Sequence, residues 1–279
     1  MSQSNADQIA YWNGDAGKRW ASQQTRLDAM LAPISAAALE AANVKSGEHV
    51  LDIGCGCGET SIKFATLTGG KGRVLGADVS APMLALAKQR AGTAHSHLAF
   101  AEADAAAHSF EPGAFDLMFS RFGVMFFADP DAAFANMRKA LKPGGRTAFV
   151  CWRDWRENEW VRVPIMAVRP HVPPQPQLGP EDPGPFSFTN PGRVRRVLAN
   201  AGFDVITMKP FDTQLELGNG LDDATQYLLE FGPISRALTD ATPDQKRQAT
   251  AALREALAPH AKTAPVKLGA AVWLVTAKA

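Results

Sequence analysis

Between residues 49 and 152 the sequence alternates short apolar runs with longer helix-forming segments. The apolar runs predict strands at residues 49–53, 73–79, 98–103, 115–120 and 146–152. The intervening segments predict helices at residues 59–67, 81–91 and 131–141. Strands that alternate with helices form βαβ units around a parallel sheet, and right-handed crossovers place the helices on both faces. The pattern therefore predicts a doubly wound α/β fold.

The charge balance and the cysteines narrow the class of protein. The chain has 279 residues and a formal net charge of +1, so it offers no electrostatic reason to bind nucleic acid or an anionic membrane. It contains no apolar run of membrane-spanning length, and its first residues lack the basic start and apolar stretch of a secretory signal. We therefore expect a cytoplasmic protein. The three cysteines, Cys55, Cys57 and Cys151, lack zinc-site spacing, so we expect no metal.

A glycine loop, LDIGCGCGE at residues 51–59, joins the first predicted strand to the next helix. This is the edge of the sheet at which α/β proteins bind ligands. Its glycines, Gly54, Gly56 and Gly58, let the backbone approach a ligand closely. A dinucleotide-binding loop would carry Gly or Ala at the sixth position. Counted from Gly54 that position is Glu59, and counted from Gly56 it is Ser61, so both registers fail.

Asp52 stands just before this loop and adds a second constraint. A carboxylate here would repel a pyrophosphate and attract an ammonium group, directly or through backbone and water. The loop and the carboxylate together favour a phosphate-free ligand with an amino-acid moiety. S-adenosylmethionine is such a ligand.

Residues after the second and third strands could hold the remainder of that ligand. Asp78 ends the second strand and can accept both ribose hydroxyls, although NAD enzymes use the same arrangement. Met83 could pack on the adenine ring or simply fill the core. Asp104 could accept the adenine amine while the Ala105 backbone N–H meets a ring nitrogen; the alternative for Asp104 is a surface acid at a strand end.

Five runs of the sequence carry a resemblance to a known family. They are LDIGCGCGE, GADVS (76–80), EADA (102–105), FDLMFSRFGVMFF (115–127) and LKPGG (141–145). They resemble class I S-adenosylmethionine-dependent methyltransferases, with a closer likeness to the ubiquinone/menaquinone-biosynthesis type and related small-molecule methyltransferases. The resemblance covers residues 45–152 well. It implies a mostly parallel, seven-stranded sheet with an antiparallel final strand, residues 270–277, and S-adenosyl-L-methionine as cosubstrate.

The resemblance also assigns positions around the cosubstrate. Asp52 and the three glycines would line its methionine end, and Ser120 would sit beside the sulfonium and the acceptor. The segment YWNGDAGKRW (11–20) is similar to one found in this group and suggests that Tyr11, Trp12 or Trp20 closes over the cosubstrate. Aromatic anchors of a docked helix would look identical in sequence.

The chain divides into six predicted segments. They are an N-terminal helical cap (1–45), a Rossmann-like core that binds S-adenosylmethionine (46–152), a proline-rich insertion (153–190), a core helix and strand (191–211), a helical insertion on the acceptor side (212–265) and a final core strand (266–279). The proline-rich insertion cannot be one continuous helix or a central strand. We expect the three blocks outside the core to form a helical cap over the carboxyl ends of the strands.

The sequence says less about the residues that would bind the acceptor. Phe122, Met125 and Phe126 lie beside the expected methyl donor and could line a pocket for an aromatic or aliphatic small molecule, or pack on the next helix. Methyl transfer needs a general base only when the acceptor loses a proton. None of the candidate bases stands in a motif that singles it out: His95, His97, His108, His171 and His260. No catalytic residue is assigned.

We therefore predict an enzyme that moves a methyl group to a small-molecule acceptor by in-line displacement in a capped apolar pocket. One alternative is a methyltransferase that acts on a protein or nucleic acid, and another is a non-catalytic relative that binds S-adenosylmethionine. A nicotinamide-dependent oxidoreductase is a remote alternative. We expect neither a nucleic-acid nor a membrane partner, and the oligomeric state is left open.

Overall fold

The computed structural model describes residues 3–175 and 179–279. Pro176, part of the predicted proline-rich insertion, lies outside them. The strands are β1 His49–Ile53, β2 Arg73–Asp78, β3 Leu98–Glu102, β4 Phe115–Arg121, β5 Leu141–Trp152, β6 Asp204–Gly218 and β7 Val266–Lys278. The helices are α1 Gln3–Asn13, α2 Asp15–Ser22, α3 Gln24–Ala42, α4 Glu59–Thr68, α5 Ala81–Ala91, α6 Pro130–Arg138, α7 Glu159–Val168, α8 Pro191–Asn200, α9 Leu221–Glu230, α10 Gly232–Ala237 and α11 Pro243–Leu257. Short 3₁₀ turns are η1 Val124–Phe126, η2 Trp155–Glu157, η3 Arg169–His171 and η4 Ala258–His260.

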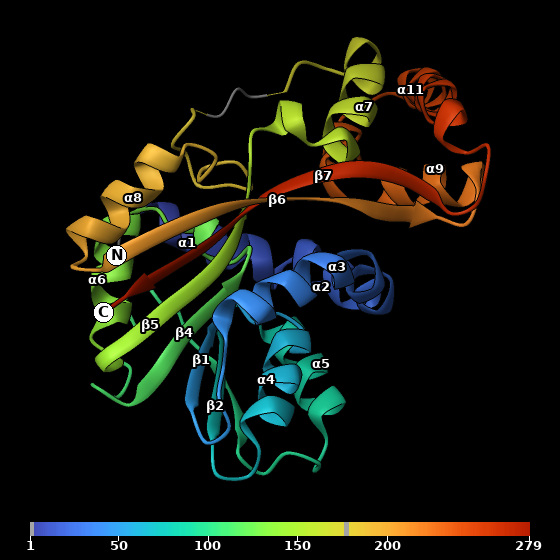
Figure 1. Ribbon diagram of the computed structural model, residues 1–279. Coiled ribbons are helices and arrows are strands. Elements are labelled where there is room, and N and C mark those ends of the chain that lie inside the picture. Colours follow the sequence, from blue (N-terminus) through green and yellow to red (C-terminus); the bar gives the residue numbers. More distant parts are fainter. Residues whose placement is uncertain (1–2, 176–178) are drawn as a thin grey trace.

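These strands form one seven-stranded sheet in the order β3-β2-β1-β4-β5-β7-β6. The first five pair in parallel, and β7 is antiparallel to both of its neighbours. Helices α3, α4 and α5 lie on one side of the sheet and α6 and α8 on the other (Figure 1). The predicted doubly wound fold with an antiparallel final strand is confirmed. Its order reverses beside β1 and β4, the switch point at which such sheets bind ligands.

The sheet is closed on both faces by fully buried aromatic rings. On the α4 side Phe64 packs edge-on against Phe119 of β4, with 4.7 Å between ring centroids. Phe134 of α6 packs against Phe149 of β5 and against Phe188. Because β1 and β4 are buried almost throughout, the loops after them stand on a rigid base.

The remaining helices gather at the end of the sheet where β5 stops. Helices α7, α9, α10 and α11 pack on one another and on the outer ends of β6 and β7. Figure 1 shows α7, α9 and α11 above the sheet, with α1 behind and α2 between them and the core. We call α1, α2, α7 and α9–α11 together the cap. Among the described residues, no helix has the length and hydropathy needed to cross a bilayer.

Two expectations need correction. The strand of the predicted core segment 191–211 runs on to Gly218, so residues 212–218 belong to the sheet and the helical insertion begins at Leu221. The alternation of buried Leu215 and Leu217 with outward polar residues carried this signal. Strand β5 begins at Leu141, because Leu141, the first residue of the LKPGG run, pairs with Phe115 at the start of β4. The proline-rich insertion is not one continuous helix, as predicted, and its longest helix is α7, which accommodates Pro164.

Candidate functional site

The glycine loop after β1 adopts the left-handed backbone at all three predicted glycines, with φ of +66° at Gly54, +54° at Gly56 and +80° at Gly58. The three have different surroundings. A Cβ at Gly54 would lie 2.8 Å from the Cα of Gly123, and one at Gly58 would lie 2.9 Å from the Phe100 ring. A Cβ at Gly56 would meet only the Met83 sulfur, at 3.8 Å. Gly54 and Gly58 are thus needed for close packing within the protein, and Gly56 alone leaves room beside the backbone.

Asp52 lies at the base of the loop and is completely buried. Its Oδ2 accepts hydrogen bonds from Thr60 Oγ1 at 2.7 Å and from Ser61 Oγ at 2.6 Å. Its Oδ1 is buried without a hydrogen-bond partner among the described residues. Burial raises the pKa of Asp52 to about 6, although both hydroxyl donors favour the ionised form. A cationic ligand group beside Oδ1 would supply the partner that this buried oxygen lacks.

Asp78 ends β2 and braces the same loop. Its Oδ2 accepts the Gly56 N–H at 2.7 Å and its Oδ1 accepts the Ser80 N–H at 2.8 Å. Burial raises its pKa above the ordinary value. Each carboxylate oxygen can accept more than one hydrogen bond, so the side chain can still take ribose hydroxyls. Ser80 stands at the N-cap of α5, but its hydroxyl donates to the Trp12 carbonyl instead of capping the helix.

Met83, Asp104 and Ala105 lie around the same edge. Met83 and Ala105 are buried, and the Met83 sulfur faces Gly56. Asp104 accepts the Ala106 N–H at 3.0 Å through Oδ1. Its Oδ2 accepts a hydrogen bond from the side-chain amide of Asn5. Helix α1 thus already places an amide donor on Asp104, the carboxylate predicted to accept the adenine amine.

Residues 120–123 make a tight turn beside the glycine loop. Ser120 is buried, and its Oγ accepts the Gly123 N–H at 3.1 Å. Phe122 adopts a φ of +66°, a left-handed conformation that is costly for a bulky residue. Strain of this kind persists where surrounding contacts impose it and is common at functional sites.

An aromatic stack follows from Phe122. Its ring lies parallel to that of Trp152 at 4.2 Å, and Trp152 contacts Trp160 of α7 at 4.8 Å. Met125 is fully buried and belongs to the hydrophobic core cluster. Its carbonyl oxygen accepts from Ser187 Oγ and from the Gly184 N–H, which ties the proline-rich segment to the turn.

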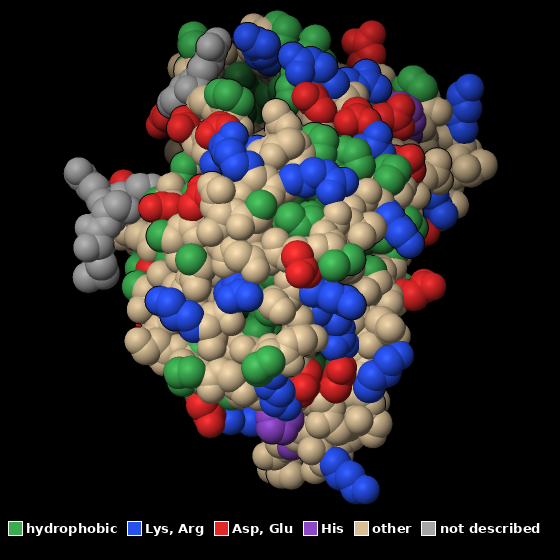
Figure 2. Space-filling view, turned by 60° about the vertical axis from the view of Figure 1, so that its left-hand side comes forward, with side chains coloured by type: hydrophobic (Ala, Val, Ile, Leu, Met, Phe, Trp, Pro, Cys, Tyr) green, Lys and Arg blue, Asp and Glu red, His purple; other side chains and the backbone are tan. Residues whose placement is uncertain are grey.

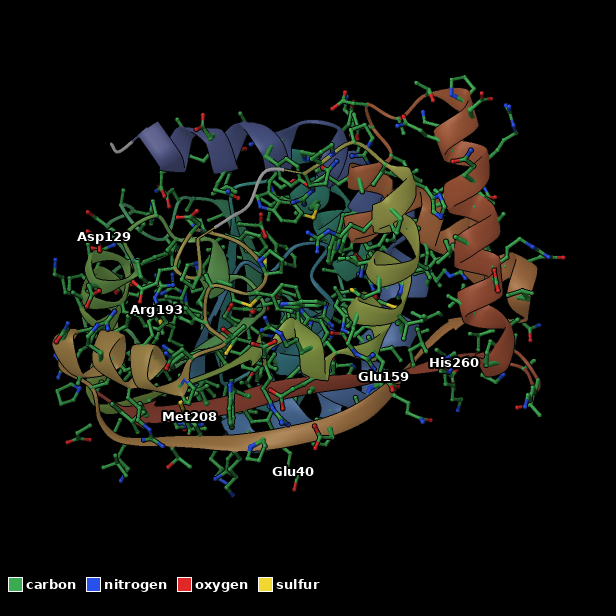
Figure 3. All side chains as sticks on the ribbon, turned by 90° about the horizontal axis from the view of Figure 1, so that it is seen from above. Glu40, Asp129, Glu159, Arg193, Met208 and His260 are labelled. Carbon is green, nitrogen blue, oxygen red and sulfur yellow. The ribbon has the colours of Figure 1, made fainter. Side chains whose placement is uncertain are left out.

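Asn158 was not predicted from the sequence. This buried side chain hydrogen-bonds to both the N–H and the C=O of Ala271 in β7, and accepts from the Trp160 indole at 3.1 Å. Next to it, Glu159, which is labelled in Figure 3, accepts a hydrogen bond from the Gly269 N–H. These bonds fix α7 on the sheet and orient Trp160. A lone Asn before a helix carries no sequence signal for such a long-range role.

The N-terminal helices close over the strand ends through half-buried aromatic rings. Trp12 packs edge-on against Phe126 at 5.4 Å and against Trp20 at 5.8 Å, and Trp20 reaches Phe231 after α9 at 5.2 Å. The Asn13 side chain bonds to the Val79 carbonyl and the Ala81 N–H next to Asp78. The structure thus brings both predicted tryptophans together with Phe126, and adds Phe231 from the block at residues 212–265.

A buried cluster of charged side chains lies between α3, α4 and the end of β4. Arg121 donates to Glu59 at 2.8 Å and to Ser35 at 2.7 Å. Nearby, Arg90 donates to the Cys57 carbonyl of the glycine loop and to Asp28. This cluster was not predicted from the sequence. The available signal was that Glu59 and Arg121, which carry opposite charges, directly follow Gly58 and Ser120 in two of the motif runs.

The histidines lie outside these arrangements or are bound to backbone. The His97 ring contacts the Ala65 carbonyl at 2.8 Å, near the amino end of β3. His260 lies at the outer rim of the cap (Figure 3). Cys55 and Cys57 are buried in the loop, where burial raises the pKa of both thiols, for Cys57 to about 12. In the described part of the chain, no group of three or more His, Cys, Asp or Glu side chains is arranged to hold a metal ion.

Comparison with known proteins matches this part of the molecule. Residues 50–145 fit a family model described as a methyltransferase domain. The chain is 40% identical over 111 residues to a ubiquinone/menaquinone biosynthesis C-methyltransferase of Cellvibrio japonicus, a match that covers 39% of this chain and 44% of that enzyme. The chain therefore spans less than half of that relative's length. The predicted resemblance is confirmed over the core.

Solved structures extend the likeness to the whole fold. The YcgJ protein of Bacillus subtilis superposes with a TM-score of 0.57 at 17% identity, covering 88% of this chain and 97% of that one. The [4+2]-cyclase SpnF superposes with a TM-score of 0.51 at 20% identity, covering 88% and 80%. Identities this low establish the architecture only.

Proposed function

We infer that this chain, which carries a class I methyltransferase domain in residues 50–145, transfers the methyl group of S-adenosylmethionine to a small-molecule acceptor. One observation carries the inference. A loop with an open side at Gly56 stands between a buried carboxylate with an unpartnered oxygen, Asp52, and a second carboxylate at the next strand end, Asp78. This set offers a place for an ammonium group and for a diol, and the nearby cations Arg90 and Arg121 are paired with Asp28 and Glu59.

The residues present fit S-adenosylmethionine at each end. Asp52 Oδ1 is a buried acceptor that an ammonium group would satisfy. Asp78 would hold the ribose hydroxyls, with Met83 and Ala105 forming apolar walls and Asp104 accepting the adenine amine. Asp104 also accepts from Asn5 of α1, so this amide would share the carboxylate with the adenine amine or give way to it.

The chain's own contribution to the reaction is binding, orientation and the exclusion of water. When bound, S-adenosylmethionine supplies an activated methyl group on a sulfonium. The turn at residues 120–123 would set the distance between acceptor and donor, because Gly123 rests directly on Gly54. Trp12, Trp20 and Phe231 cover the strand ends and would keep water out. Holding two reactants in line accounts for a large part of such a rate enhancement.

The acceptor is proposed to be small and apolar. Phe122, Phe126, Trp152 and Trp160 supply aromatic surface beside the turn, and the cap that contributes Trp160 lies outside residues 50–145, which fit the methyltransferase-domain model. The match to the C. japonicus enzyme covers 39% of this chain, so the acceptor of that enzyme is not carried over. A closed cap also disfavours a macromolecular acceptor. On the face drawn in Figure 2, Lys and Arg side chains are scattered among Asp and Glu and form no continuous basic stripe.

A binding-only or rearranging activity is the second candidate, favoured by one observation. The same fold is found in a [4+2]-cyclase, so the architecture alone does not determine that a methyl group is moved. The apolar site lacks a committed base, and such a site would also suit that role.

Two measurements test the proposal. Titration calorimetry should show S-adenosylmethionine or S-adenosylhomocysteine binding at micromolar strength and no heat with NADH; the reverse result would contradict it. Methyl transfer from labelled S-adenosylmethionine across a metabolite library should then label at least one small apolar compound. Tight binding with no labelled product would instead favour the second candidate.

A further inference from the structure

The buried pair Arg121–Glu59 links the two loops on which the proposed site depends. Arg121 follows Ser120 at the end of β4, and Glu59 follows Gly58 as the first residue of α4. Only 12% of the Arg121 side chain and 7% of the Glu59 side chain are exposed, with 2.8 Å between Nη1 and Oε2. Ser35 of α3 accepts a second bond from the same nitrogen at 2.7 Å. A pair this buried costs desolvation that hydrophobic residues would avoid, so its presence needs a reason.

The strand register places this pair on the same side of the sheet as Asp52. Asp52 lies opposite Phe119 in the parallel β1–β4 pairing. Side chains two residues apart on a strand share a face, so Phe119 and Arg121 point to the side that Asp52 faces. That side is covered by α4, whose Thr60 and Ser61 bond to Asp52.

The charged groups around Asp52 come from five elements. Glu59, itself paired with Lys63, comes from α4 and raises the pKa of Asp52, while Arg121 from β4 lowers it. Asp28 on α3 pairs with Arg90 of α5. Asp78 at the end of β2 acts together with Asp52 on the Cys55 thiol between them. Arg121 is the cation, and Glu59 the acid, that act directly on Asp52.

We propose that Arg121 is a positioning residue that couples the two loops: its guanidinium holds the end of β4 on the start of α4 and sets a positive charge beside the Asp52 carboxylate. The inference rests on the proposed function for its purpose, because the ionised Asp52 is the form that attracts an ammonium group. Glu59 fixes the guanidinium in place and partly offsets its charge. The turn at residues 120–123 and the glycine loop are thereby joined by one ion pair.

The test is a charge cycle on the protein without cosubstrate. The free energy of unfolding is measured against pH, from about 4.5 to 8, for the natural chain, Arg121→Gln, Glu59→Gln and the double variant, each with and without Asp52→Asn. The difference that Asp52→Asn makes isolates the titration of Asp52. Because the folded-state pKa of Asp52 lies above the ordinary 3.8, its contribution is complete below that value and is lost as the pH rises through about 6.

We expect Arg121→Gln to move this loss upward by about one pH unit or more. Glu59→Gln should move it downward, and the double variant should return it close to the natural position. Arg121→Lys, which keeps the charge, should leave it nearly unchanged. If Arg121→Gln does not fold, comparing the double variant with Glu59→Gln gives the same contrast.

A purely structural pair predicts a different outcome. All variants would then lose stability while the Asp52 titration stayed at one pH, and that result would overturn the proposal. Failure of the natural chain to bind S-adenosylhomocysteine in calorimetry would contradict the proposed function and leave this cycle unaffected. The two ideas can therefore fail separately.

Discussion

The sheet core and the cap are held together in different ways. The core consists of continuous strand ladders over fully buried rings such as Phe64, Phe119 and Phe149. The N-terminal part of the cap rests on half-buried rings and a few polar links, among them Ser80 to the Trp12 carbonyl and Asn5 to Asp104. Regions with few buried contacts open most readily. We therefore expect the core to act as a rigid platform for the proposed cosubstrate site and the N-terminal part of the cap to act as a cover that opens over it.

This difference should appear most strongly when the cover is removed. Deleting residues 1–25 takes away α1, α2, Trp12 and Trp20 but no strand. We expect methyl transfer to fall by at least about 100-fold, because orientation and water exclusion are lost together. Cosubstrate binding should weaken as well. Circular dichroism should show the sheet retained; loss of the sheet would mean that the cap is part of the core.

Adding one methyl group at Gly17 should loosen the N-terminal part of the cap. A Cβ at Gly17 of α2 would lie 2.0 Å from the Trp12 carbonyl oxygen and 2.7 Å from Ser80 Oγ. Overpacking of this kind costs about 1–3 kcal/mol, so Gly17→Ala should shift the closed-to-open ratio by about tenfold or more. Turnover and the rate of limited proteolysis before residue 24 report it. Gly70→Ala is the matched control, since a Cβ there meets nothing within 4 Å; equal effects of the two would refute the docking.

The same contrast explains what the sequence could predict. The bounds of β1 and α5 were predicted to the residue, because a short apolar run and a helix-forming segment are local signals. The link from Trp20 to Phe231 joins residues more than 200 positions apart, and nothing local announces it. Asn158 and the Arg121–Glu59 pair were missed for the same reason. Gly54 and Gly58 were identified correctly as loop glycines, but the neighbours that require them, Gly123 and Phe100, were visible only in the fold.

On the core side the effect should be confined to the cosubstrate. Asp78→Ala removes the acceptor for the Gly56 N–H as well as the proposed partner of the ribose. Hydrogen bonds to charged groups contribute about 1.5–3 kcal/mol each, so affinity for S-adenosylhomocysteine should fall by about tenfold or more. Calorimetry measures this, and Asp240→Ala, an exposed carboxylate, is the control. An unchanged dissociation constant in a folded Asp78→Ala protein would exclude the ribose role.

The smallest effect should be a pH dependence that belongs to the core alone. Burial raises the pKa of Asp52 to about 6, so the ionised form that attracts an ammonium group is depleted as the pH falls through that value. Between pH 7 and pH 5.5 the ionised fraction drops about fourfold, and affinity for S-adenosylhomocysteine should drop by a similar factor. The pKa of Asp78 is also raised, so Asp52→Asn is measured in parallel with the natural chain. Asp78 titrates in both proteins, and the difference between their curves of affinity against pH isolates Asp52. The truncated chain lacking residues 1–25 should keep the same dependence at lower overall affinity, because none of the groups around Asp52 comes from α1 or α2. A dependence that persists in Asp52→Asn, or disappears on truncation, would place the titrating group elsewhere and would undo the division between platform and cover.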